Sequence, residues 1–159
     1  MKKFALIALV LTVGVTCAFA ASLKVPWFVD NAPAAAGIPP TSGTTTLVYL
    51  ANNTNSELVC SIRYFSAAGA DLGPNTNNTF SIDPNATVAF RPVANDPSTA
   101  NGGQENPASG NLIPDRPRDV DTQKNGSLVV SFPGAGGELG GQVTTYSSLG
   151  FASAHALIP

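Results

Sequence analysis

Cysteine and histidine are nearly absent from this sequence, which has 159 residues but only two cysteines and one histidine. Cys17 lies in an apolar N-terminal segment, so loss of that segment leaves Cys60 alone and excludes an intrachain disulfide. Zinc sites draw most of their ligands from these two residue types, and we therefore predict no metal site. No motif pairs His155 with a serine or cysteine nucleophile. We predict that the protein is not an enzyme and uses no cofactor.

Charged residues are also scarce, at 11% of the chain. The N-terminal segment contains Lys2 and Lys3 and no acidic residue, so its removal changes the net charge from −2 to about −4. A mildly acidic chain with scattered charges lacks the basic patch that binds nucleic acid or an anionic membrane surface. We expect neither as a partner.

The long hydrophobic run is confined to the N-terminus. Two lysines precede an almost unbroken apolar stretch that ends in Ala18-Phe19-Ala20, where small residues occupy the positions that a signal peptidase reads. We predict a cleaved signal peptide over residues 1–20, a mature start at Ala21 and no membrane attachment afterwards. A retained membrane helix or a lipoprotein anchored through Cys17 is the alternative. The Met-Lys-Lys start is typical of bacteria and indicates a secreted, periplasmic or cell-surface protein.

Two consecutive strands are predicted in the centre of the chain. Residues 58–65 (LVCSIRYF) alternate so that Leu58, Cys60 and Ile62 share one face, and residues 44–51 form a similar run. The residues between them are polar turn formers, so we predict a hairpin whose apolar face is covered by a second sheet. On this face Cys60 is expected to be a small buried side chain. The alternative is a thiol that pairs between chains or reacts.

Further short strands are predicted on both sides of an irregular region. Residues 79–83 and 87–93 form a second predicted hairpin, 127–132 and 142–146 pair as partners, and 153–158 can be a last strand. With no amphipathic helix after the leader, this pattern predicts an all-β, immunoglobulin-like β-sandwich of about seven or eight short strands over residues 44–159.

One long loop is predicted from residue 94 to residue 126. It contains four prolines and much of the charge of the chain, and loops of this length are usually functional or disordered. Leu112, Ile113 and Val120 could attach part of it to the sandwich. With nearby aromatic side chains, the loop could bind a glycan or another ligand, which is the alternative function that we consider.

An N-terminal strand and connector are predicted over residues 21–43. The alternation places Leu23, Val25, Trp27 and Val29 on one face of the strand, and Pro26 indicates an edge position because proline cannot donate to a ladder. The connector is rich in proline, alanine and glycine, and this composition predicts a flexible link. The strand could form the first edge of its own domain, or these four side chains could insert into a neighbouring copy.

The central region resembles a known class of modules. TTTLVYLANNTNSELVCSIRYFSAAGADLG, followed by NTFSIDPNATVAF, is similar to the immunoglobulin-like sandwich modules of bacterial secreted and cell-surface proteins. The similarity covers residues 44–93 and lies in the order of strand and turn types. It implies a fold and a location, and it implies no catalytic residue.

These observations predict a non-enzymatic secreted module with a structural or adhesive role. Self-association through the N-terminal strand, or binding of another cell-surface protein, is the expected interaction. The glycan-binding alternative predicts that the loop of residues 94–126 carries the site.

Overall fold

The computed structural model of the chain describes residues 20–33, 38–92, 104–106, 113–114, 116, 125–150 and 152–158. These residues form two five-stranded sheets in which every pairing is antiparallel, and they contain no helix. The all-β sandwich predicted from the sequence is therefore confirmed. The predicted leader lies outside the described residues, except for Ala20. Among the described residues there is no helix long and apolar enough to cross a membrane.

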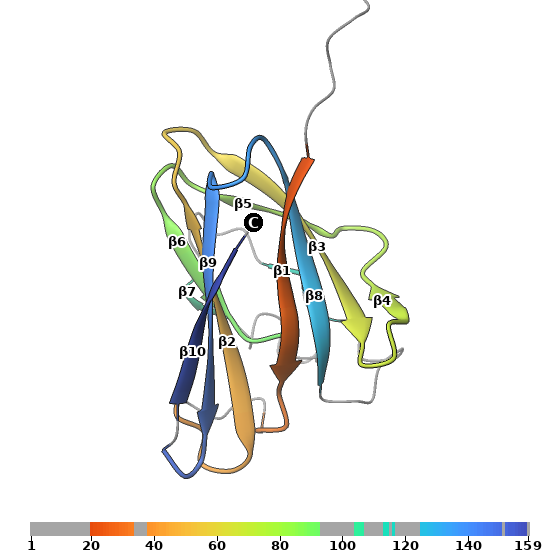
Figure 1. Ribbon diagram of the computed structural model, residues 1–159, viewed down its shortest axis with the longest axis vertical. Coiled ribbons are helices and arrows are strands. Elements are labelled where there is room, and N and C mark those ends of the chain that lie inside the picture. Colours follow the sequence, from red (N-terminus) through yellow and green to blue (C-terminus); the bar gives the residue numbers. More distant parts are fainter. Residues whose placement is uncertain are drawn as a thin grey trace, which may run out of the picture.

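The first sheet runs in the order β1, β8 and β3, and two short strands share the far edge of β3. Its strands are β1 (Ala20–Val29), β8 (Asn125–Pro133), β3 (Leu58–Ser66), β4 (Asp71–Gly73) and β5 (Thr79–Ile82). Figure 1 shows β1 at one edge of this sheet, beside β8. The edge position predicted for the N-terminal strand is thus observed.

The second sheet runs in the order β10, β9, β2, β6 and β7. Its strands are β10 (Ala152–Leu157), β9 (Leu139–Ser147), β2 (Thr44–Asn52), β6 (Thr87–Phe90) and β7 (Gln104–Asn106). Eight of the ten named strands coincide with predicted ones. The other two, β4 and β7, have three residues each, which is too short for a periodic pattern to identify.

The hairpins predicted from the sequence are wrong, because each predicted pair is split between the two sheets. Residues 44–51 and 58–65 form β2 and β3, which lie in different sheets, and the same holds for β5 with β6 and for β8 with β9. Apolar alternation reports only that one face of each strand is buried. A connection longer than the two-residue hairpin turns can span the ~10 Å between sheets as well as the ~5 Å between paired strands.

A buried asparagine links two of these connections. The Asn52 side-chain amide donates to the carbonyl oxygens of Ser56, Ile82 and Asp83 at 2.7–3.0 Å. It therefore joins the β2–β3 turn to the β5–β6 turn through hydrogen bonds to carbonyl groups of both.

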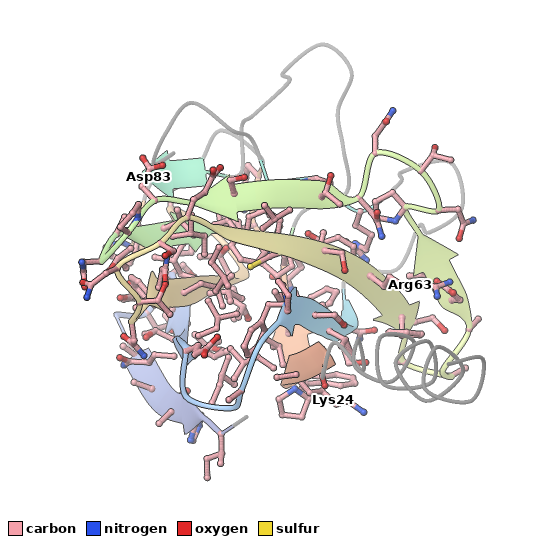
Figure 2. All side chains as sticks on the ribbon, turned by 90° about the horizontal axis from the view of Figure 1, so that it is seen from above. Lys24, Arg63 and Asp83 are labelled. Atoms are coloured by element: carbon pink, nitrogen blue, oxygen red, sulfur yellow. The ribbon has the colours of Figure 1, made fainter. Side chains whose placement is uncertain are left out.

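The core lies between the two sheets and receives side chains from both, as Figure 2 shows in the view from above. Buried apolar side chains come from β1, β2, β3, β4, β5, β6, β8 and β9. Because β1 supplies three of them, the N-terminal strand completes the core as well as the sheet. The fully buried side chains from β1 are Leu23, Val25 and Phe28.

Candidate functional site

The candidate site is the position of β1 along β8. Residues 20–25 pair with residues 133–128 of β8, and after an irregularity Phe28 and Val29 pair with Gly126 and Asn125. Both the N-terminal and the C-terminal part of β1 are therefore paired with β8. Because β1 is an edge strand, β8 would be the edge of the first sheet without it.

A β-bulge at Pro26 and Trp27 changes which side chains of β1 face the core. Leu23 and Val25 point inward as predicted, but beyond the bulge Phe28 is buried, Val29 is half-buried and Trp27 is 51% exposed. The alternation predicted for Leu23, Val25, Trp27 and Val29 is therefore interrupted after Val25. A bulge adds one residue to one strand, so the inward-facing positions shift by one.

Two glycines make room for the side chains that β1 inserts. Gly126 lies opposite Phe28 in the β1–β8 register, and a Cβ atom there would collide with the Phe65 carbonyl oxygen and lie 3.2 Å from Phe28 Cζ. On β9, a Cβ atom added to Gly141 would lie 2.5 Å from Leu23 Cδ2. The Phe28 ring and the Leu23 side chain thus occupy recesses that any larger residue at Gly126 or Gly141 would narrow.

Phe28 is also held by two side chains of different character. Its ring meets the Tyr64 ring edge to face, with 6.4 Å between centroids and an interplanar angle of 89°. The Arg116 guanidinium carbon lies 5.2 Å from the Phe28 ring centroid, within the range of a cation–π contact. Tyr64 in turn donates a hydrogen bond of 2.9 Å from its hydroxyl to the Pro114 carbonyl oxygen.

Part of the region from residue 94 to residue 126 packs against the sandwich. Within it, Ile113 and Arg116 are buried, and residues 104–106 form β7 beside β6. The expectation that Ile113 attaches this region to the sandwich is confirmed, and the region is not a continuous loop. The remaining expectations, including Leu112 and Val120 as anchors and a ligand site on the loop, fall on residues outside those described.

A buried ion pair fixes the chain just after β1. Arg91 Nη2 donates to Asp30 Oδ1 at 2.6 Å, and the two side chains are only 1% and 3% exposed. The Thr45 hydroxyl donates to the same carboxylate oxygen at 3.0 Å, and the Arg91 guanidinium donates to the Pro33 carbonyl oxygen at 3.4 Å. Asp30 therefore ties the end of β1 to the second sheet.

Hydrogen bonds join the two ends of the connector between β1 and β2. The backbone N–H groups of Asn31 and Ala32 both donate to the Thr44 carbonyl oxygen, at 3.0 and 3.2 Å. The Thr44 N–H donates back to the Asn31 side-chain oxygen at 2.6 Å. The two ends of the connector are thus adjacent, and residues 34–37 within it lie outside the described residues.

Sequence reasoning missed three residues that hold β1 in place, namely Phe28, Asp30 and Arg91. One signal was available, because Pro26 cannot take part in a regular ladder and therefore marks a candidate bulge. No comparable signal identifies the Asp30–Arg91 pair. The two residues are far apart in the sequence, and charged residues at the ends of strands usually face solvent.

The other candidate side chains lie apart from β1. Cys60 is buried, as predicted, and burial raises the pKa of its thiol to about 12, so the neutral thiol dominates at neutral pH. His155 is exposed on β10. Within the described ranges, no three His, Cys, Asp or Glu side chains are arranged to hold a metal ion.

Comparison of the chain with known protein families, with characterised proteins and with solved structures finds no match.

Proposed function

We propose that this chain is a non-enzymatic, secreted structural or adhesive module that assembles with copies of itself by exchange of β1. In the exchanged state, β1 of one copy lies along β8 of the next. The observation that carries this proposal is that β1, an edge strand and the first named strand of the chain, supplies Leu23, Val25 and Phe28 to the core. Addition of a strand to an open sheet edge is a known mode of protein association, with side-chain pockets for specificity.

The position of the predicted cleavage site supports this proposal. Cleavage before Ala21 would place the mature N-terminus at the start of β1, whose first pairs are Ala20 with Pro133 and Ala21 with Phe132. A strand with a free end can leave its sheet and enter another without threading a loop through the fold. The resemblance of residues 44–93 to secreted and cell-surface modules supports the proposed location.

Energetic considerations indicate why a displaced β1 would be replaced by another copy. Burial of each large apolar side chain contributes about 1.5–3 kcal/mol, so three of them contribute roughly 5–9 kcal/mol. Whole domains are stable by only about 5–15 kcal/mol. A chain with an empty β1 position would therefore be close to unfolding, whereas strand exchange restores every contact between β1 and the rest of the sandwich.

The first test is the mass of the mature protein, residues 21–159, refolded at increasing concentrations and measured by light scattering. We expect assemblies whose mass increases with the refolding concentration and does not change on addition of reductant, because Cys60 is buried. A synthetic peptide of residues 21–30 should limit the growth of the assemblies. The same peptide with Leu23→Asp and Phe28→Asp should not. A monomer at every concentration would overturn the proposal.

A further inference from the structure

The structure assigns a binding groove beside β1 to an amphipathic ligand that has an apolar body and a carboxylate head, such as a free fatty acid. The groove lies between β1 and the strands β9 and β10, and its volume is about 580 Å³. Pockets for small ligands usually have volumes of about 300–1,000 Å³. The groove is separate from the side chains that β1 places in the core, and it exists whichever copy supplies β1.

The β-bulge gives this groove its largest side chain. Pro26 and Trp27 line the groove because the bulge turns Trp27 away from the core, where the sequence alternation would have placed it. Bulges commonly direct a side chain toward a binding or active site. Trp27 lies 51% exposed in a concave surface, where it offers a large apolar face to a ligand.

The remaining lining indicates the apolar part of the ligand. Val29 of β1 and Val143 of β9 line the groove with Leu157 and Ile158, and Ile158 is largely exposed. These aliphatic side chains and Trp27 line the groove from both sheets. An alkyl chain can bury its surface against them without leaving hydroxyl groups unpaired, which a sugar could not do.

The polar residues of the groove indicate the head group. Lys24 lines it from β1 and His155 from β10, and Ser153 and Thr145 add hydroxyl groups. None of the described lining residues is acidic, although acidic residues outnumber basic ones in the whole chain. Figure 2 shows Lys24 on the outer side of β1, away from the core. Because Lys24 carries a positive charge and His155 has a ring N–H to donate, the groove favours a carboxylate over a neutral head.

The test uses Trp27 as its reporter, because it is the one tryptophan of the chain. The mature protein is titrated with 11-bromoundecanoic acid below its micelle concentration. Bromine at the end of the alkyl chain quenches tryptophan fluorescence on contact. We expect saturable quenching, and competition by undecanoic acid, which carries no bromine.

Two comparisons test the head group. Lys24→Ala should weaken binding of the acid about fivefold, the effect of one exposed ion pair, and should leave binding of the methyl ester unchanged. Arg63→Ala is the matched control, because it removes an exposed cation elsewhere on the first sheet and should have no effect. Absence of saturable quenching would overturn the assignment. So would equal binding of acid and ester, or a fluorescence change with neutral glycosides in place of the acid.

Discussion

Replacement of Asp30 by alanine is expected to lower the free energy of unfolding by about 3–5 kcal/mol. The substitution leaves the Arg91 guanidinium buried without its carboxylate partner, and it removes the acceptor of the Thr45 hydroxyl. Removal of one member of a buried pair is costly because the other charge stays desolvated. Urea denaturation followed by far-ultraviolet circular dichroism measures the effect, and an unchanged m value would show that the unfolding reaction is the same.

The chain contains a matched control for this prediction. Arg63 and Asp71 also form an ion pair, but their side chains are 50% and 37% exposed. Arg63→Ala should therefore change stability by no more than about 1 kcal/mol. The double substitution Asp30→Ala with Arg91→Met should recover much of the stability lost by Asp30→Ala alone, because it also removes the buried guanidinium that has lost the Asp30 carboxylate. An effect of Asp30→Ala as small as that of Arg63→Ala would contradict the structure.

Phe28→Ala is expected to lower the free energy of unfolding by about 3–5 kcal/mol, the range for truncation of a buried phenylalanine. The ring is fully buried, and its loss removes the edge-to-face contact with Tyr64 and the cation–π contact with Arg116. The recess beside Gly126 would remain as a cavity. Urea denaturation followed by circular dichroism again provides the measurement.

The adjacent tryptophan provides the control for Phe28. Because the bulge leaves Trp27 51% exposed, Trp27→Ala should change stability by about 1 kcal/mol or less. Unbroken alternation along β1 would predict the opposite order, with Trp27 inside the core and Phe28 outside it. A larger effect for Trp27→Ala than for Phe28→Ala would therefore contradict the observed register of β1.

The sequence was sufficient to locate most strands and the burial of Cys60. In β3 the alternation is uninterrupted, so Leu58, Cys60 and Ile62 are buried as predicted. Each inward position there depends on its neighbours along the strand, and a local pattern contains that information. The edge position of β1 was also predictable, because the restriction that Pro26 imposes is local.

The pairing of strands was not predictable from the same pattern. Whether β2 pairs with β3 or with β9 depends on contacts between residues far apart in the chain. The period-two pattern of a strand is the same in both arrangements. The Asp30–Arg91 pair and the groove beside Trp27 were missed for the same reason, because each forms only after distant strands meet.

The central claim, exchange of β1 between copies, is tested most directly by a disulfide that reports which chain supplies β1. Ser22 of β1 pairs with Ser131 of β8, and Ser131 pairs on its other side with Ser61 of β3. Cysteines at Ser22 and Ser131 would join β1 to the β8 that it contacts. Cysteines at Ser61 and Ser131 join two strands of one sandwich and serve as the control.

The measurement is electrophoresis of oxidised assemblies under denaturing conditions without reductant. We predict a ladder of covalently linked chains for Ser22→Cys with Ser131→Cys, because β1 and β8 come from different copies. The Ser61→Cys and Ser131→Cys control should run as a monomer. If both variants run as monomers although the protein assembles, β1 remains on its own chain and the strand-exchange account is wrong.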